Sequence, residues 1–248
     1  MILKFISSNA KYWRNIVDSW SMLDEANLIA SQDGLELRAM DPTRAAMVDF
    51  SLLVVAFDTY ECEKGPHRLG LNIEEFTKII KRVSESDILT LELNEPEKVE
   101  LSFSGNLEKT FGLALLDLGE NDYPAPSISS NASMTLLTKT FQSILKDAEL
   151  VSDYLVIEAD EFEFIFKGSS ETKDFSTTIE KDHDEVAKFK VKGKHRALYD
   201  LNYLKEMTKP NIHDLLKISF SDAMPIEFSY PIPFGGKLSY YYAPRIEV

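Results

Sequence analysis

The sequence predicts an α+β fold in which two similar halves are joined by a surface linker. The order helix, strands, helix, strands occurs twice along the chain at similar spacing, which indicates an internal structural repeat. Between the halves, the stretch 117–131 is rich in glycine, asparagine, proline and serine, a composition typical of a linker. We therefore expect an N-terminal domain at 1–117, a connector at 118–131 and a C-terminal domain at 132–248.

The first half contains two amphipathic helical patterns among strand patterns. In the second helix, Asn72 followed by Glu75 resembles a capping box, and Ile73, Phe76 and Ile80 contribute to the apolar stripe. The expected helices are 10–23 and 72–83, and the expected strands are 2–6, two hairpin strands on either side of 32–34, 45–53, 88–93, 98–103 and 109–116.

The second half follows the same order. Phe141, Ile144 and Leu145 form the apolar stripe of its first helix, as a period of 3.6 residues requires. The expected helices are 139–149 and 200–208, and the expected strands are 132–137, 154–159, 162–166, 173–180, 187–191, 215–220, 226–230 and 237–242.

A polar corner connects two strand patterns in the segment 33–50. Leu35, Leu37 and Ala39 share one face by alternation, whereas Met40 stands where a solvent-facing residue is expected. The segment 41–43, Asp-Pro-Thr, predicts a turn, because proline fixes φ and short polar side chains bond nearby backbone. An ordinary hairpin would explain this pattern without any functional role.

Composition narrows the possible classes of protein. The hydrophobic share of 44% in 248 residues is enough for a substantial core. The longest apolar run is far below the ~20 residues of a membrane helix, and the start of the chain lacks a signal-peptide pattern, so we expect a cytoplasmic protein. Cys62 is the lone cysteine, which excludes an intrachain disulfide. The net charge of −14 would repel nucleic acid unless positive charge is segregated.

Basic residues recur on all four predicted helices despite this acidic total. Lys78, Lys81 and Arg82 lie off the apolar stripe of their helix, and Lys139 and Lys146 are spaced to share one side of theirs. Lysine and arginine could instead serve only to solvate amphipathic helices. Their recurrence in every helix favours a positive surface formed by the helices, with an acidic exterior elsewhere.

Catalytic motifs are missing from the sequence. It contains no nucleotide-binding glycine pattern, no nucleophile elbow and no metalloprotease helix pattern. The four histidines are scattered, and Asp182, His183 and Asp184 read as a solvated acidic loop. We predict a binding scaffold with no catalytic residue, no metal ligand and no cofactor.

Several segments spread along the chain form a recognisable combination: 24–26 followed by 33–34, then 38–44, 70–72, 78–82, 150–153 and 242–246. Together they resemble the sliding DNA clamp family, the proliferating cell nuclear antigen, and above all its archaeal branch. The resemblance covers nearly the whole chain. It implies two similar clamp domains per subunit, each with two helices on one side of antiparallel sheets, and a trimeric closed ring with helices around the hole. It also implies a non-enzymatic processivity factor for DNA replication and repair.

The resemblance further implies which residues face duplex DNA without reading its sequence. These are Lys11, Arg14, Lys78, Lys81, Arg82, Lys139, Lys146, Lys205 and Lys209. Ser143 stands where many relatives carry a basic residue, so the lining departs from the family pattern there.

Two further sets of residues follow from the same resemblance. A pocket for short peptide motifs of DNA polymerase, clamp loader, flap endonuclease and ligase would be formed by Met40, Arg44, Ala45, Leu118, Tyr123, Pro124, Pro225, Tyr241, Ala243 and Pro244. Removing the chain after Ser239 should then abolish recruitment of these partners. Subunits would meet through Lys109, Phe111, Leu113, Leu115, Phe175, Thr177 and Ile179, where the strand 109–116 pairs with the strand 173–180 of the next subunit.

Two alternatives remain open from the sequence. The chain could be one subunit of a hetero-trimeric clamp. It could also be an acidic peptide-binding module or small-molecule enzyme with no DNA role.

Overall fold

The computed structural model describes residues 1–120, 123–124, 126, 128–210, 212–222 and 224–245, and the chain divides into two compact units. Unit 1 comprises Met1–Arg44, Val48–Pro124 and Ile232–Leu238, and unit 2 comprises Ala45–Met47, Ala125–Pro231 and Ser239–Val248. The order β-α-β-β-β-β-β-α-β-β-β occurs twice, once before and once after the connector. The predicted internal repeat and α+β class are confirmed.

The elements of the first repeat are β1 (Leu3–Ser7), α1 (Ala10–Asp18), β2 (Glu25–Ser31), β3 (Gly34–Met40), β4 (Ala46–Leu53), β5 (Thr59–Cys62), β6 (Pro66–Asn72), α2 (Ile73–Ile80), β7 (Ile88–Glu95), β8 (Lys98–Ser104) and β9 (Lys109–Ala114), with the short 3-10 helix η1 (Val54–Ala56) after β4. Within unit 1 the strands form antiparallel sheets in the orders β5-β1-β7-β8-β9 and β4-β3-β2-β6.

The elements of the second repeat are β10 (Ala132–Leu137), α3 (Thr138–Glu149), β11 (Tyr154–Ala159), β12 (Glu163–Ser169), β13 (Asp174–Glu180), β14 (Val186–Val191), β15 (His195–Asp200), α4 (Leu201–Thr208), β16 (Leu215–Phe220), β17 (Ile226–Ile232) and β18 (Gly236–Tyr242), with η2 (Pro233–Gly235) before β18. Within unit 2 the sheet orders are β13-β12-β11-β15 and β14-β10-β16-β17-β18.

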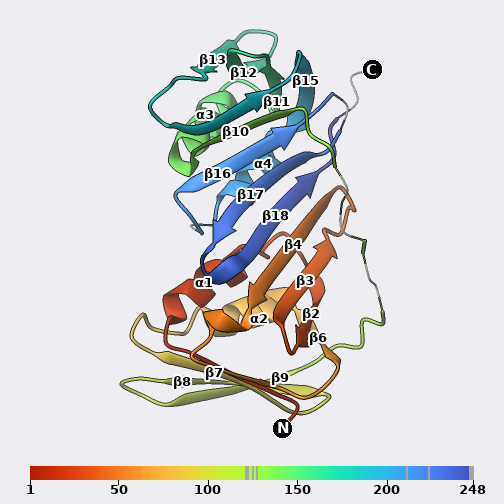
Figure 1. The fold of residues 1–248 in the computed structure, drawn as a ribbon, viewed down its shortest axis with the longest axis vertical. Helices are drawn as coiled ribbons and strands as arrows, with labels where there is room; N and C mark the ends of the chain where they lie inside the picture. The colour runs from red at the N-terminus through yellow and green to blue at the C-terminus, as the bar shows by residue number, and fades with distance from the viewer. Residues whose placement is uncertain (121–122, 125, 127, 211, 223, 246–248) are drawn as a thin grey trace. The chain divides into compact units, whose positions relative to one another are not determined.

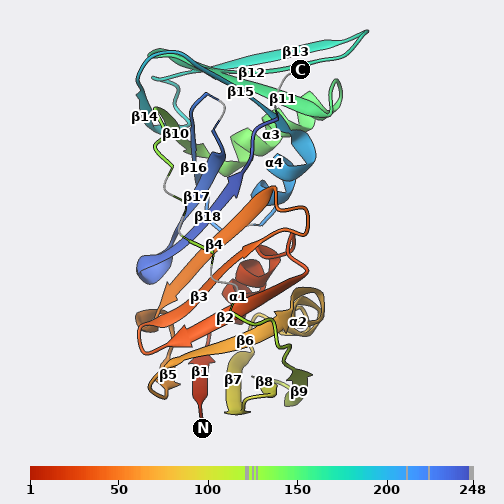
Figure 2. The ribbon, with the colours of Figure 1, turned by 90° about the vertical axis from the view of Figure 1, so that its right-hand side faces the viewer.

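Aromatic side chains join the helices to the sheets in each unit. The indole ring of Trp13 on α1 stacks on Phe5 of β1, with ring centroids 4.9 Å apart. Phe141 on α3 contacts Phe166 of β12 at 5.6 Å and Phe228 of β17 at 5.3 Å, so it touches both sheets of unit 2. In Figures 1 and 2, α3 and α4 lie on the same side of β16 and β17. Each helix therefore buries its apolar stripe and leaves its polar side for function.

Side-chain caps define where three helices begin. The Oδ1 of Asn72 accepts a hydrogen bond from the backbone N of Glu75 at 3.0 Å, which confirms the predicted start. Asn9 and Asp200 cap α1 and α4 in the same manner.

Several predicted boundaries are wrong. The helix expected at 10–23 ends at Asp18, because the hydroxyl of Ser19 bonds back to the carbonyl of Ile16 and the chain continues in turns. The helix expected up to 83 ends at Ile80, and the strand expected up to 116 ends at Ala114. Three strands, β5, β6 and β15, were not predicted. β5 is only partly buried, β6 begins at a proline and contains Gly70, and β15 begins with the basic residues His195 and Arg196.

Candidate functional site

Basic residues of unit 1 lie on the exposed sides of α1 and α2, where acidic neighbours hold them. Lys81 Nζ lies 2.8 Å from Oδ1 of Asp18, and Lys11 Nζ lies 2.7 Å from Oε1 of Glu85. The hydrogen bond from Lys11, together with its charge, lowers the pKa of Glu85, so this carboxylate remains ionised at neutral pH. Both lysines are therefore compensated before any ligand arrives.

Lys78 and Lys81 line one hollow of about 710 Å³ at the start of α2. The hollow also contains the acidic side chains of Asp24, Glu25 and Glu74. Lys78 Nζ lies 2.5 Å from Glu74 one turn earlier, and the hydrogen bond and charge of Lys78 lower the pKa of Glu74. The two lysines thus line the same hollow, but acidic side chains line it as well.

In unit 2, three predicted basic residues come together between α3 and α4. Lys146, Lys205 and Lys209 line a hollow of about 370 Å³. The side-chain Nε2 of Gln142 donates to the carbonyl of Thr208 at 2.6 Å and links the two helices. Because Lys205 pairs with Glu149 of α3 and Lys209 pairs with Glu206 at 3.4 Å, this group is also partly compensated.

The remaining residues predicted to face DNA lie at accessible helix positions. Arg14 is half-buried on α1, and Arg82 and Lys139 are exposed. Ser143 is exposed on α3, so its hydroxyl leaves this part of the helix surface without a cation. Among the carboxylates that pair with these lysines, sequence reasoning missed Glu74, Glu85, Glu149 and Glu206. That the nine basic residues form one DNA-facing surface stays a prediction.

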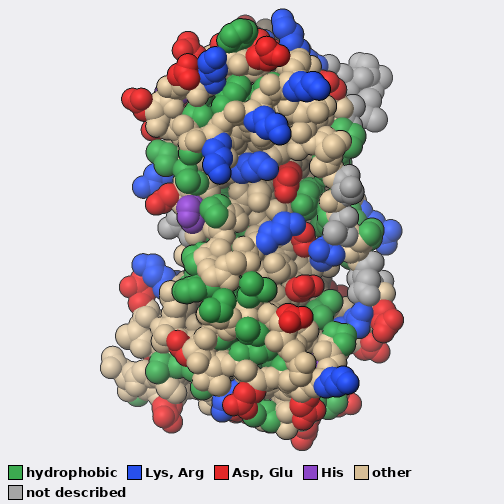
Figure 3. All heavy atoms as spheres, viewed as in Figure 1, with side chains coloured by type: hydrophobic (Ala, Val, Ile, Leu, Met, Phe, Trp, Pro, Cys, Tyr) green, Lys and Arg blue, Asp and Glu red, His purple; other side chains and the backbone are tan. Residues whose placement is uncertain are grey.

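The sheet face of unit 2 opposite the helices also carries basic side chains. In Figure 1 the strands β16 and β17 lie in front of α4, and Figure 3 shows lysine and arginine side chains gathered over this region in the upper half of the view. Lys188, Lys190 and Lys217 are exposed on β14 and β16. The expectation of an acidic exterior is wrong here, because the alternation of these strands directs three lysines to the outer face.

Side chains of unit 1 hold the beginning of the connector against its sheet. Asn27 Nδ2 donates to the carbonyl of Gly119 at 3.0 Å, and Arg38 Nη1 donates to the carbonyl of Tyr123 at 3.3 Å. Leu116 bridges Gly70 of β6 through its backbone. A Cβ built on Gly70 would meet the carbonyl oxygen of Leu116 at 2.0 Å, so only glycine permits this approach.

Arg38 is itself fixed by a buried carboxylate. Its Nε and Nη2 lie 3.0 and 2.9 Å from Oδ1 of Asp49, which is 4% exposed. Lys237 Nζ lies 2.7 Å from the other carboxylate oxygen. Asp49 therefore orients the guanidinium that reaches the connector.

The predicted corner after β3 is confirmed as a turn. The backbone N and the hydroxyl of Thr43 both donate to Oδ2 of Asp41, at 3.1 and 2.6 Å. Arg44 adopts a left-handed backbone with φ of 60°. This geometry ends β3 and begins the approach to β4.

The residues predicted for the peptide pocket belong to both units. Within unit 2, the backbone N of Ala243 donates to the carbonyl of Ala45 at 3.0 Å and brings these two residues together. Tyr241 is 8% exposed and its hydroxyl donates to Glu227 at 3.2 Å, so little of its ring is accessible. Partly or fully exposed are Met40, Arg44, Ala45, Leu118, Tyr123, Pro124, Pro225, Ala243 and Pro244. Ile246, part of the resembling tail, lies outside the described residues.

The predicted subunit-interface strands β9 and β13 each end a sheet within their unit. Leu113 and Ile179 are only 7% and 4% exposed, and Phe111 packs on Phe103 with centroids 5.6 Å apart. Lys109, Leu115, Phe175 and Thr177 are half-buried. At these two described edges, backbone donors and acceptors are therefore more available for contact with another subunit than apolar side chains are.

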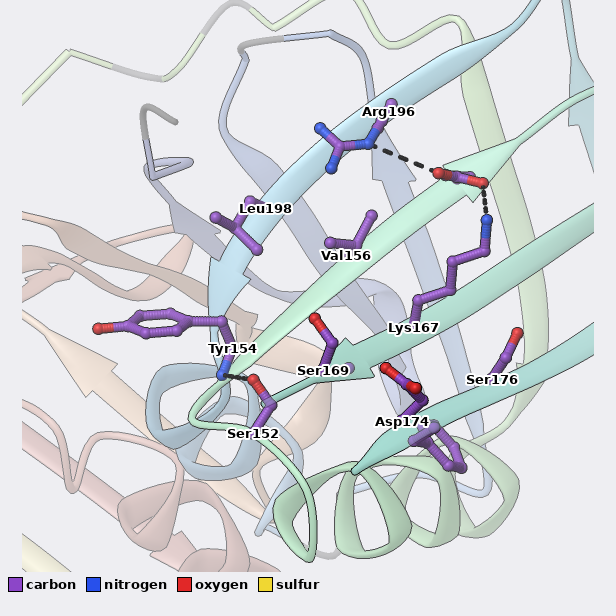
Figure 4. A pocket seen from close by; sticks show the side chains of 12 residues that line it. Ser152, Tyr154, Val156, Lys167, Ser169, Asp174, Ser176, Arg196 and Leu198 are labelled. Carbon is purple, nitrogen blue, oxygen red and sulfur yellow. Dashed lines mark hydrogen bonds and ion pairs between the residues drawn. The ribbon is translucent and has the colours of Figure 1, made fainter. Parts of the chain in front are cut away.

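A hollow of about 530 Å³ lies on the four-stranded sheet of unit 2 (Figure 4). Lys167 reaches Glu158 at 2.6 Å, and Arg196 Nε lies 3.5 Å from the other oxygen of Glu158. Phe175 is the one predicted site residue among those that line it. Because its central charges compensate one another, the hollow does not define a binding site by itself.

Comparison with known proteins gives full-length relatives. A family model described as proliferating cell nuclear antigen, N-terminal domain, matches residues 5–122. The DNA polymerase sliding clamp of Thermococcus gammatolerans is 32% identical over 249 residues, which is 100% of this chain and of the relative. The DNA polymerase sliding clamp of Cenarchaeum symbiosum is 31% identical over 228 residues, with 91% of each chain covered.

Solved structures agree with this relation. The crystal structure of PCNA from Thermococcus kodakaraensis matches with a TM-score of 0.92 at 23% identity, over 98% of this chain and 100% of that chain, and shows the shared fold. The PCNA2-PCNA3 complex from Sulfolobus tokodaii matches with a TM-score of 0.89 at 25% identity, over 98% and 100%. Within the described residues, helices long and apolar enough to cross a membrane were not found. The chain belongs to the sliding clamp family, whose archaeal members are named DNA polymerase sliding clamp and whose structures are named PCNA.

Proposed function

We propose that this chain is a DNA polymerase sliding clamp that encircles duplex DNA and acts by binding, not by catalysis. The observation that carries the proposal is the match to relatives named DNA polymerase sliding clamp over the full chain length. The exposed or partly exposed basic residues on all four helices are consistent with it. Lysine and arginine would contact phosphates without reading bases, which allows the ring to slide.

Ring closure would use the terminal strands of two sheets. β9 of one subunit would pair with β13 of the next, so that the unpaired backbone groups of both edges are satisfied. A head-to-tail contact that closes on itself makes a ring. We propose a homotrimer, with a hetero-trimeric assembly as the second candidate because one similar structure is named as a complex of two PCNA chains.

Partner proteins would dock through short peptides on the corner, connector and tail residues named above. We propose domains at 1–117 and 132–248 with the connector 118–131 between them. The hydrogen bonds from Asn27 and Arg38 to connector carbonyls support a fixed path for its beginning. A fixed path means that the connector loses less conformational freedom when a peptide binds, which favours binding.

Primer extension on a circular template tests the function. With its clamp loader and polymerase, the chain should lengthen products, and the effect should vanish when loader is omitted. Unchanged product length in the presence of active loader would contradict the proposal. The mass of the purified particle separates the assemblies, because a homotrimer is three times the 28.2 kDa chain, whereas a monomer requires other chains for closure.

A further inference from the structure

Three lysines lie in register on the outer sheet face of unit 2. Thr135 of β10 pairs with Lys188 of β14 on one side and with Lys217 of β16 on the other. Lys190 pairs with Ser133, one step along the same face. We call Lys188, Lys190 and Lys217 the lysine patch.

Strand geometry sets the spacing of the patch. Residues two apart on a strand are about 7 Å apart, and residues two strands apart are about 10 Å apart. Hydroxyl side chains of Ser133 and Thr135 lie between the lysines on β10. The result is a flat surface of closely spaced positive charges with hydrogen-bonding groups between them.

The charge of the patch is uncompensated within the described residues. Many lysines elsewhere form ion pairs, among them Lys4 with Glu92 and Lys237 with Asp49. Within the part of the chain that the structure describes, no such pair involves a lysine of the patch. Glu227 lies on β17, the strand next to Lys217, where it pairs with Ser219, and its carboxylate accepts hydrogen bonds from Ser239 and Tyr241.

Among the described residues, the strand that carries two of these lysines lies at the edge of its sheet. β14 is the terminal strand of its sheet and pairs with β10 on one side. A terminal strand presents backbone donors and acceptors that an extended peptide can satisfy. The side chains of such a peptide would alternate between faces, so every second residue would lie beside the lysine patch.

We propose that an extended acidic segment of a partner protein adds as a strand beside β14, with carboxylates at alternate positions paired with Lys188 and Lys190, while Lys217 adds to the positive charge of the face. Two observations favour a peptide over a nucleic acid strand. The paired positions of this face carry serine, threonine, lysine and glutamate, with the leucine pair Leu137 and Leu215 at one end, and these side chains provide no aromatic platform for bases. The overall charge of −14 also opposes a dense polyanion more than a short peptide.

Fluorescence anisotropy with the full chain tests this docking. The probe is a short labelled peptide in which aspartate alternates with threonine. Reversing Lys188 or Lys190 to glutamate should weaken binding about fivefold each, because an attractive cross-strand pair becomes a repulsive one. Lys64→Glu, an equal charge change on an exposed loop of unit 1, should leave the affinity unchanged.

Two further peptides distinguish strand addition from charge attraction. A peptide of the same composition with its aspartates adjacent, and one with alternate backbone amides methylated, should each bind at least about tenfold more weakly. Equal binding of all three peptides, or no loss in the lysine variants with circular dichroism unchanged, would overturn the proposal. Tighter binding of oligothymidylate, lost in the same lysine variants, would assign the patch to nucleic acid instead.

Discussion

Lys81 caps the C-terminus of α2 and places its ammonium group 2.8 Å from the carboxylate of Asp18, the last residue of α1. A lysine predicted to contact DNA is therefore occupied by an acid of the neighbouring helix. Its side chain is 51% exposed, so the pair is a surface ion pair of modest strength. If Lys81 faces DNA as proposed, a phosphate would replace this carboxylate, and Asp18 would lower the affinity for DNA.

Asp18→Asn should consequently strengthen binding to duplex DNA. Releasing Lys81 adds one available cation, and we expect affinity at low salt to rise about two- to fivefold. The slope of log affinity against log salt should steepen by about 0.9. Titrations of a labelled duplex at several salt concentrations measure both quantities. Asp33→Asn, an equal change at an exposed turn, is the control, and an equal effect of both variants would show only a change in net charge.

Reversing Lys78, Lys81 and Arg82 to glutamate should impair loading and sliding while leaving assembly intact. All three residues lie on or just after α2, and none belongs to β9 or β13, so the mass of the particle should not change. Product length in loader-dependent primer extension should fall toward the level without clamp. The same reversal at Lys64, Lys192 and Lys194, which are exposed and lie outside the helices and outside β9 and β13, keeps the charge change. A similar loss in that control would remove the case for a DNA-facing role of α2.

Helix faces were predictable from sequence because burial repeats with the helical period. Trp13, Ile16 and Phe141 are all buried, as their spacing indicates. The pair between Glu74 and Lys78 is also local, since the two residues are one turn apart. By contrast, Lys205 and Glu149 are 56 residues apart and meet only because α3 and α4 pack together. Sequence can therefore locate the basic residues and local pairs, but not the distant carboxylates that compensate the other lysines.

The lysine patch shows a second limit of the sequence. Lys188 and Lys190 alternate along a predicted strand, but their face could be assigned only from the pairing of Phe189 with Met134 on the buried side. Once that register is known, the lysines must lie on the outer face.

Removing the side chains that donate hydrogen bonds to the connector should weaken partner binding. Asn27→Ala deletes one hydrogen bond to the carbonyl of Gly119, so amide hydrogen exchange near this residue should accelerate and affinity for a partner peptide should fall about two- to fivefold. Arg38→Ala should do more, because it also leaves the buried Asp49 with Lys237 alone and lowers the free energy of unfolding by about 1–3 kcal/mol. Faster exchange without weaker peptide binding would place the peptide site elsewhere.

Gly70→Ala should destabilise unit 1 through the start of the connector. The added methyl group would lie 2.0 Å from the carbonyl oxygen of Leu116, so the backbone bridge must open, at a cost of about 1–3 kcal/mol. Thermal unfolding followed by circular dichroism measures the change. Gly119→Ala is the comparison: it meets nothing within 4 Å but has φ of +64°, so it should cost about 1 kcal/mol by backbone strain alone. A smaller loss for Gly70→Ala than for Gly119→Ala would contradict the steric explanation.

Testing the role of the C-terminal tail requires the removal of fewer residues than the truncation after Ser239 that the sequence suggested. Ending the chain at Ser239 would remove Tyr240 and Tyr242, which are 1% and 7% exposed, and Tyr242 stacks on Tyr203 with centroids 4.3 Å apart. Loss of such buried rings costs about 3–5 kcal/mol each, so failed recruitment could reflect unfolding. A chain ending at Tyr242 keeps β18 and removes only the segment predicted to line the pocket.

Arg245→Ala tests whether partner binding requires the tail to be held in its observed position or only requires the tail to be present. The backbone N of Arg245 donates to the carbonyl of Leu198 at 2.8 Å, and its guanidinium lies over the ring of Tyr154, 4.2 Å from the centroid. Losing this side chain should free the tail while β18 stays folded, so peptide affinity should fall about two- to fivefold with little change in melting temperature. Tyr154→Leu should reproduce the loss, because it removes the ring on which the guanidinium rests. If the chain ending at Tyr242 still binds partner peptides as tightly as the full chain, the tail does not form the pocket and Arg245 only anchors the end of the chain.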